Sequence, residues 1–322
     1  MDQHSFPRRQ LWGFAVVAYG LLVASPTVGA APPAKYCRFQ AGDQIAYGLV
    51  EGDRVRQLAG DLFGEWTRTD KTYALADVRL LVPTRPTQVL AMAGNYRSHL
   101  GGDVTTTTIT TVTTVKSDAA SKKTSATSET TAETRAPGEV PPKYAIPQPF
   151  FKSPSCLTAH GTNILIPPDA TTVHYEGELV IVIGRRAQKV SRQDAPQYVL
   201  GVTCGIDVSE RVWQKNDIQW WRAKSSDTFG PCGPYITTGI DYNNLLLQTR
   251  VNGEVKQKER TSEFIHDVAT VVSAISQQVT LEPGDLIFTG TPGETSALKP
   301  GDVVEVEIEG IGVLQNKVAA GK

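Results

Sequence analysis

A run of five consecutive apolar residues, LVIVI at positions 179–183, constrains the fold of this 322-residue chain more than any other feature. A β-strand points successive side chains to opposite faces, so a strand that is apolar at every position must be covered on both faces. We therefore expect this run in the interior of a sheet. The 28 glycines, the 20 prolines and the low share of charged residues, 20%, favour a strand-rich domain with many tight turns over a helical bundle.

Other segments agree with a sheet that carries few helices. Residues 36–82 alternate short apolar runs with turns and predict a small hairpin-rich N-terminal piece. The remaining expected elements are buried strands over residues 89–96 and 198–206, a short helix over 194–199, a helix over 264–279, and two strands that follow the Pro-Gly-Asp turns at 283–285 and 300–302. A closed or rolled sheet fits this order best.

The N-terminus has the pattern of a signal peptide. Arg8 and Arg9 precede an apolar run over residues 11–24, and Val28 and Ala30 place small side chains before a cleavage point that follows Ala30. We expect export to the periplasm or the exterior, for which the arginine pair suggests the twin-arginine route. The alternative is an uncleaved anchor, but the run of 14 residues is shorter than the roughly 20 that span a bilayer. We expect no stable membrane span after cleavage.

A low-complexity stretch interrupts the chain over residues 104–135, where 13 of 32 residues are Thr and four are Ser. Few of its side chains could build a core, so we predict a disordered insert. Its Thr-rich start, residues 105–115, has strand propensity, so an edge strand or an aggregation-prone segment is the alternative. An attachment or O-glycosylation role would explain the insert but none of the motifs described below.

The four cysteines, at positions 37, 156, 204 and 232, have no CxxC spacing, which argues against a thiolate zinc site or a redox pair. An oxidising compartment permits one or two disulfides. Cys204, however, lies in the buried-looking strand over residues 198–206, where a free thiol packs as a small apolar group.

Charge argues for a small-molecule partner. The chain has 32 basic and 33 acidic residues, and its one segment of interleaved aromatic and basic residues, 220–231, has too little positive charge for a nucleic acid. Motifs for nucleotide binding (GxGxxG or a P-loop) and for common hydrolases (GxSxG or HExxH) are absent from the sequence.

Three carboxylates indicate a metal site. Glu176 and Glu178 are two residues apart at the start of the 179–183 strand, so they share a face, and the buried stripe on that face makes two like charges costly without a cation. Asp207 ends the strand over residues 198–206, whose alternate positions are small and are expected to leave room beside the carboxylate. An oxygen-rich set suits Mg²⁺, with Mn²⁺ or Ca²⁺ as alternatives. On spacing alone, a solvated strand end remains the competing interpretation.

Five motifs in order resemble the fumarylacetoacetate hydrolase family. They are Asn95-Tyr96-Arg97-Ser98-His99, Tyr175-Glu176-Gly177-Glu178, Asp207-Val208-Ser209-Glu210-Arg211, Arg222-Ala223-Lys224-Ser225 and Gly290-Thr291-Pro292-Gly293. The resemblance implies a mixed, β-rich (α+β) β-roll with a few flanking helices. It also implies a small N-terminal domain over residues 36–85, a catalytic domain over 86–320 that the insert interrupts, and a homodimer.

Carried over residue by residue, the resemblance assigns the site. Its metal ligands are Glu176, Glu178 and Asp207, its catalytic pair is His99 and Lys224, and its substrate contacts are Arg211, Gln214, Lys224 and Thr291. His99 is the implied general base, on a segment that orders over the ligand. Hydrolytic members place a glutamate three residues after this histidine, whereas here position 102 is Gly and the nearest acid is Asp103.

These residues predict a divalent-metal-dependent hydrolase that cleaves a carbon–carbon bond in acylpyruvate-like or other 1,3-dicarbonyl or 2-oxo acids. The same metal chemistry also serves an isomerase or decarboxylase of 2-oxo or 2-hydroxy-diene-dioic acids. A hypothesis of another class is an exported binding protein that kept the metal site and lost turnover.

Overall fold

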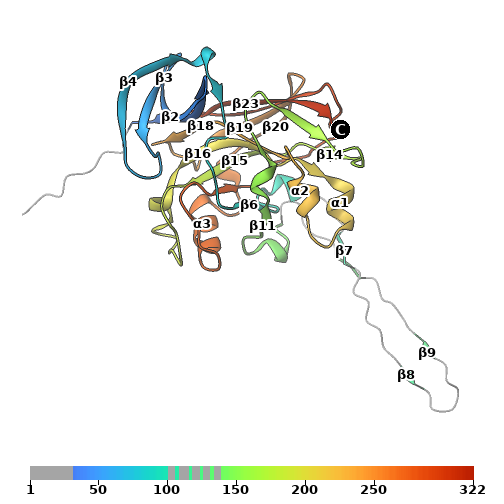
Figure 1. Cartoon of the computed structure of the whole chain (residues 1–322). Helices are drawn as coiled ribbons and strands as arrows, with labels where there is room; N and C mark the ends of the chain where they lie inside the picture. The colour runs from blue at the N-terminus through green and yellow to red at the C-terminus, as the bar shows by residue number, and fades with distance from the viewer. Residues whose placement is uncertain (1–31, 101–105, 109–115, 118–123, 126–130, 134–138) are drawn as a thin grey trace, which may run out of the picture. The chain divides into compact units, whose positions relative to one another are not determined.

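The computed structural model describes residues 32–100, 106–108, 116–117, 124–125, 131–133 and 139–322 (Figure 1). The predicted signal peptide and most of the predicted insert lie outside the described residues. Four short strands fall within the insert: β7 (Thr106–Thr108) pairs with β10 (Thr131–Glu133), and β8 (Lys116–Ser117) pairs with β9 (Thr124–Ser125). In the described part of the chain, no helix has the length and apolar character needed to cross a membrane.

The N-terminal piece is an antiparallel meander of four strands. It comprises β1 (Ala34–Ala41), β2 (Gln44–Glu51), β3 (Arg54–Gly60) and β4 (Trp66–Ala74). Gly42 and Gly52 have positive φ angles, 56° and 64°, and allow the two tight turns that join the first three strands. The meander extends the main sheet, because β1 also pairs with β18 (Gly230–Thr238).

The interior of this sheet is the apolar run. It forms β15 (Gly177–Ile183), in which every residue is buried between two antiparallel neighbours, β16 (Val199–Ile206) and β21 (Leu286–Phe288). This confirms the prediction for residues 179–183. Leu179 and Ile181 pack into one core, and Val180 packs into a second core on the opposite face. Full burial of each such side chain stabilises the fold by about 1.5–3 kcal/mol.

Two further strands complete the edge of the sheet near the site. β21 pairs in parallel with β6 (Val89–Met92), which pairs with the edge strand β11 (Pro149–Lys152). Two short strands also belong to this sheet: β5 (Arg79–Leu80) pairs with β1 and β12 (Leu157–Thr158) pairs with β18. β14 (Val173–His174) and β17 (Ser209–Glu210) pair with each other.

A second sheet packs against the first through the larger core. Its strand order is β13 (Asn163–Ile166), β23 (Gly312–Ala320), β22 (Val303–Ile308), β19 (Leu246–Val251) and β20 (Glu254–Arg260). Leu247 and Val306 from this sheet share a cluster with Ile181 from the first. The result is the strand-rich β-roll with few helices that the sequence predicts.

The α-helices are short: α1 (Arg211–Asn216), α2 (Trp221–Ser225) and α3 (Val268–Ser276). The single turns of 3₁₀ helix are Leu75–Asp77, Ser98–Leu100, Pro142–Tyr144, Pro154–Cys156, Ala195–Tyr198 and Thr261–Glu263. The predicted short helix over 194–199 corresponds to the 3₁₀ turn Ala195–Tyr198.

The helix predicted over residues 264–279 is too long. Asp267 caps α3 by accepting a hydrogen bond from Thr270 N at 2.8 Å, so the helix begins at Val268. The preceding residues have another partner, because Phe264 forms a β-bridge with Tyr96 and Ile265 N donates to the Asn95 carbonyl. The apolar period therefore continues beyond the helix.

All four cysteines are buried and free. Burial raises the pKa of the Cys204 thiol to about 12, as expected for a thiol that packs as an apolar group.

Candidate metal centre and active site

Three carboxylates meet where β15 begins and β16 ends. Glu176 precedes β15, Glu178 is its second residue and Asp207 follows β16, and the antiparallel register places Glu178 opposite Gly205. One oxygen from each carboxylate lies within 4.8 Å of the others, and all three side chains are buried. Local strand geometry thus brings together the three acids that the sequence singled out.

The small residues of β16 do not leave an empty space beside these acids, contrary to the sequence expectation. A β-carbon on Gly205 would meet Val180 Cγ2 at 2.4 Å and the Phe288 ring at 2.5 Å. The glycine instead allows two large side chains to pack against the strand.

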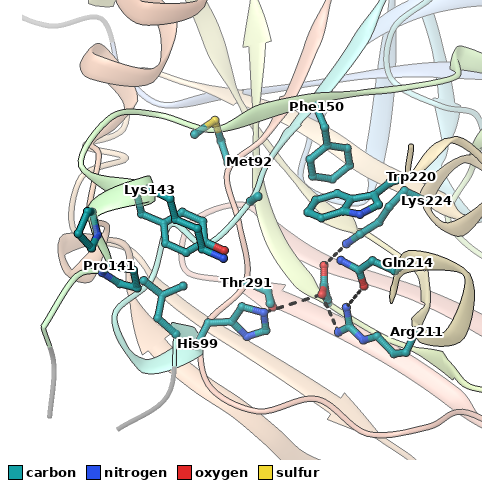
Figure 2. A pocket seen from close by; sticks show the side chains of 16 residues that line it. Met92, His99, Pro141, Lys143, Phe150, Arg211, Gln214, Trp220, Lys224 and Thr291 are labelled. Atoms are coloured by element: carbon teal, nitrogen blue, oxygen red, sulfur yellow. Dashed lines mark hydrogen bonds and ion pairs between the residues drawn. The ribbon is translucent and has the colours of Figure 1, made fainter. Parts of the chain in front are cut away.

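Lys224, on α2, places its ammonium among the carboxylates. Its Nζ donates to Glu176 Oε2 at 2.6 Å and to Asp207 Oδ2 at 2.7 Å. An ammonium has three N–H donors, so one remains for a ligand in the adjoining cavity. Figure 2 shows Lys224 reaching into this cavity beneath Phe150 and Trp220.

A second lysine lies on the far side of Asp207. Lys152, the last residue of β11, is 2% exposed and donates to Asp207 Oδ1 at 2.6 Å. Its other partners are the carbonyl oxygens of Lys224 and of Phe229, the latter at 3.2 Å. All three N–H groups are therefore used, and this lysine joins a carboxylate of the cluster to the backbone that carries Lys224.

The surroundings give two of the carboxylates different electrostatics. Burial opposes ionisation of Glu176, but the charges of Lys224 and Arg211 outweigh it and hold the pKa of that carboxyl well below its ordinary value. Burial raises the pKa of Glu178 well above its ordinary value, and the neighbouring charges of Asp207 and Glu176 raise it further. Glu178 accepts a hydrogen bond from Gly290 N at 2.7 Å.

Arg211 and Gln214 reach the cavity from α1. The Arg211 guanidinium contacts Glu176 Oε1 at 2.6 Å and donates to Gln214 Oε1 and Thr295 Oγ1, both at 2.8 Å. Glu210 caps the helix, since its carboxylate accepts hydrogen bonds from Trp213 N and Thr172 N. A buried carboxylate thus fixes the helix that presents the arginine.

His99 lies at the mouth of the cavity with a defined tautomer. Its Nδ1 is 2.6 Å from the carbonyl oxygen of Gly293, and its Nε2 is 3.9 Å from Glu176 Oε1. A carbonyl oxygen only accepts hydrogen bonds, so Nδ1 carries a proton. In the neutral ring, Nε2 is consequently unprotonated and able to accept a proton on the side of the carboxylates.

Thr291 also lines the cavity, but its hydroxyl is committed elsewhere. It donates to the Gly177 carbonyl and accepts from Gln257 Nε2, both at 2.9 Å. Gln257 Oε1 accepts from Gly177 N at 3.1 Å, so Gln257 ties β15 to the loop that holds Thr291. Thr291 therefore shapes the cavity wall through this network.

The cavity has a volume of about 570 Å³ and two chemically distinct ends. The polar end holds His99, Glu176, Arg211, Gln214 and Lys224. The other end is mainly apolar: Figure 2 shows the Phe150 ring against Trp220 on one side, with Met92 and Pro141 across the opening. Lys143 is a further cation at this end, with its Nζ 4.8 Å from the centroid of the Tyr144 ring.

The family model described as fumarylacetoacetate hydrolase C-terminal matches residues 115–319, more than half of the chain. This chain belongs to the fumarylacetoacetate hydrolase family. A second model, described as Rv2993c-like N-terminal, matches residues 34–83, which correspond to the N-terminal meander.

Two similar proteins cover most of this chain, and a third covers about half of it. Protein Rv2993c of Mycobacterium tuberculosis is 38% identical over 291 residues, which are 87% of this chain and 96% of that protein. The crystal structure of 2-hydroxyhepta-2,4-diene-1,7-dioate isomerase from Mycobacterium marinum is 37% identical with a TM-score of 0.72, and covers 90% of this chain and 100% of that chain. Oxaloacetate tautomerase FAHD2A of Bos taurus is 41% identical over 181 residues, 52% of this chain and 58% of that protein.

The structure brings the predicted family site into one place. Six of its residues line the cavity, and the other two, Glu178 and Asp207, join Glu176 in the carboxylate cluster. The six are His99, Glu176, Arg211, Gln214, Lys224 and Thr291. Sequence reasoning missed Lys152 and Gln257, because each lies in a strand at a position that periodicity does not mark as functional.

The carboxylate cluster of this family member fits a divalent cation. Three buried carboxylates offer oxygen donors close together, as Mg²⁺ and Mn²⁺ require. Glu178 is 1% exposed, and none of the ion pairs formed by the described residues includes it. A bound cation would compensate that carboxylate.

Proposed function

We propose that this protein is a divalent-metal-dependent enzyme that moves a proton within 2-oxo acids, as a tautomerase or isomerase. The observation that carries the proposal is the placement of His99, whose unprotonated Nε2 faces the carboxylate cluster at 3.9 Å from Glu176 Oε1. One base with a fixed tautomer beside a metal-binding cluster is what removal and return of a proton next to a carbonyl requires.

Glu176, Glu178 and Asp207 would hold the metal, for which we propose Mg²⁺. A bound divalent cation supplies Lewis-acid polarisation of the substrate's oxo group. The protein's own cations complement it. Arg211 binds the substrate carboxylate, and Lys224 offers its remaining N–H to the oxygen on which negative charge develops.

The proton transfer itself belongs to His99. Nε2 accepts a proton from the carbon next to the oxo group, and the electron pair of the broken C–H bond moves toward the oxo oxygen. Return of the proton to that oxygen gives the enol, which is tautomerisation. Return to a more distant carbon of a conjugated acid gives isomerisation. Neither reaction needs a further reactant, because the proton that is removed is the one that is returned.

Two relatives with these activities support the proposal. One is named an oxaloacetate tautomerase and the other a 2-hydroxyhepta-2,4-diene-1,7-dioate isomerase. The second covers 90% of this chain and 100% of its own.

Hydrolysis of acylpyruvates is a second candidate, which the size of the cavity favours. A volume of about 570 Å³ exceeds the needs of a four-carbon acid, and its apolar end offers a surface for an acyl group along Phe150, Trp220 and Met92. In this reaction His99 would instead take a proton from water as the water attacks the distant carbonyl.

A substrate panel separates the candidates. The full chain is assayed with Mg²⁺ against oxaloacetate, an unsaturated 2-hydroxy-dioate and acetylpyruvate, following enol absorbance and products, with EDTA and Glu178→Ala as controls. Metal-dependent interconversion without cleavage supports the proton-transfer enzyme. Release of pyruvate and acetate from acetylpyruvate supports the hydrolase. Tight binding of oxalate with Mg²⁺ and no turnover of any substrate contradicts both and indicates a binding protein.

A further inference from the structure

Ser98 joins three separate parts of the chain through its hydroxyl. Its Oγ accepts a hydrogen bond from Gly293 N at 2.9 Å and donates to Glu259 Oε2, on β20, at 2.5 Å. The hydroxyl accepts one of these hydrogen bonds and donates the other, so its single proton is committed to Glu259. Ser98 therefore connects the turn that carries His99 to the Gly293 loop and to the second sheet.

Both backbone polar groups of Gly293, its N–H and its carbonyl, are held by consecutive side chains. Ser98 binds its N–H, and the next residue, His99, donates from Nδ1 to its carbonyl at 2.6 Å. Gly293 has a φ of 57°, and no heavy atom lies within 4 Å of the place that a β-carbon would occupy. Glycine adopts this left-handed conformation without a steric penalty, and the hydrogen bonds with Ser98 and His99 hold its backbone there.

We propose that Ser98 is a positioning residue for His99. Its bond to the Gly293 N–H, together with the bond from His99 to the carbonyl of the same residue, holds the backbone conformation of Gly293 that directs this carbonyl at Nδ1. The ring orientation and the tautomer that leaves Nε2 unprotonated then follow. Glu259 acts indirectly. Its carboxylate accepts a hydrogen bond from the Ser98 hydroxyl, which turns a lone pair of that hydroxyl toward Gly293 N. A backbone carbonyl thus orients the ring from the Nδ1 side. This inference rests on the proposed role of His99 as the base.

Two pairs of variants test the role of the hydroxyl. Ser98→Ala removes it, whereas Ser98→Thr retains it. Glu259→Ala removes the acceptor of its proton, whereas Glu259→Gln retains an acceptor oxygen. Ser191→Ala is the matched control, because Ser191 also donates to a carboxylate, Asp194 Oδ2 at 2.7 Å, on an exposed turn outside the cavity lining. All variants are made in the full chain.

The first readout is the split between kcat and KM on the substrate that the panel identifies. We expect Ser98→Ala to lower kcat about 10- to 100-fold, because misplacement of a reacting group costs rate, while KM changes less than about twofold. Glu259→Ala lowers kcat by less. Ser98→Thr and Glu259→Gln return kcat to near the wild-type value, and Ser191→Ala leaves it unchanged. Wild-type kcat in both alanine variants overturns the proposal.

The second readout does not depend on turnover. ¹⁵N NMR of the histidine rings at neutral pH distinguishes Nδ1–H from Nε2–H tautomers, and His99→Gln assigns the signal among the five histidines of the chain. We expect the wild type to show His99 as the Nδ1–H tautomer and Ser98→Ala to show a mixture. An unchanged His99 signal in Ser98→Ala overturns the proposal.

The two readouts separate this inference from the proposed function. If the wild type turns over no substrate on the panel, the proposed function fails and the NMR comparison still decides whether Ser98 sets the tautomer. If Ser98→Ala fails to fold, Glu259→Ala carries the test, because Glu259 is half-buried on β20, the edge strand of the second sheet. A wild-type kcat together with a wild-type His99 signal in Glu259→Ala then overturns the proposal.

Discussion

Lys152 and Asp207 form a buried ion pair at 2.6 Å beneath the carboxylate cluster, with both side chains almost fully excluded from solvent. Asp207 therefore has one oxygen bound to a permanently buried cation and the other directed at Lys224. Burial opposes the charge on Lys152, but Asp207 outweighs it and raises the pKa of the lysine above its ordinary value. The pair orients one carboxylate of the cluster.

Removal of this lysine leaves a buried carboxylate and two backbone carbonyls without their donor. We expect Lys152→Met to destabilise the protein by about 3–5 kcal/mol, the range for breaking one partner of a buried pair. Urea unfolding of the metal-free protein measures the change. Lys258→Met, at an exposed position on β20, is the control and should lie within about 0.5 kcal/mol of wild type. If Lys152→Met also changed the free energy of unfolding by no more than the control does, Asp207 would have found another partner.

Glu178→Gln should separate metal binding from folding. The neighbouring carboxylates and burial make ionised Glu178 costly, so the neutral amide should leave the metal-free unfolding midpoint equal to or above that of wild type. The stabilisation by Mg²⁺, about 2.7 kcal/mol at a concentration of 100 times Kd, should be lost in the variant. Thermal unfolding with and without Mg²⁺ measures both effects. A wild-type shift with Mg²⁺ would exclude Glu178 as a ligand.

How much of this site the sequence predicts depends on how local the signal is. Glu176 and Glu178 flank one glycine at the start of an apolar strand, so strand geometry alone predicts that they share a face. Their contact with Asp207 depends in addition on the pairing of β15 with β16. The partner of Lys152 is 55 residues away, and the Gly293 carbonyl that orients His99 is 194 residues away. Such contacts depend on the tertiary packing of distant sheets and loops, which the local sequence pattern does not predict.

The fold shows the same division. An uninterrupted apolar run identifies β15 as sheet interior because burial on both faces is a property of the run itself. The apolar spacing predicts a helix longer than α3, because this spacing continues into residues whose backbone pairs with Tyr96 and Asn95. Tertiary partners, rather than propensity, decide where that helix begins.

Glu210 should make the stability of the site depend on pH. Burial opposes its ionisation, but hydrogen bonds from the backbone N–H groups of Trp213, Thr172 and Thr171 outweigh it and lower its pKa below the ordinary 4.5. A lowered pKa in the folded state gives stability that is present above the unfolded value and is lost as the pH falls through the folded value. Glu210→Gln should thus cost about 0.5–2 kcal/mol at pH 7, and the difference from wild type should shrink below pH 4.5. Urea midpoints at pH 7 and at progressively lower pH test this, and a difference that is constant with pH would contradict it.

Arg211→Lys should damage substrate binding more than folding. The guanidinium contacts Glu176, Gln214 and Thr295 at once, and a lysine has neither the planar fork nor the reach to keep all three. If Arg211 binds the substrate carboxylate, the variant should raise KM about 10- to 100-fold through loss of a bidentate contact, with a smaller change in kcat. Steady-state kinetics on the identified substrate measure KM, and calorimetric titration with oxalate plus Mg²⁺ measures the Kd of oxalate.

Arg186→Lys, at an exposed ion pair with Glu282, is the control and should match wild type. A loss confined to kcat would instead place Arg211 with the groups that stabilise the transition state.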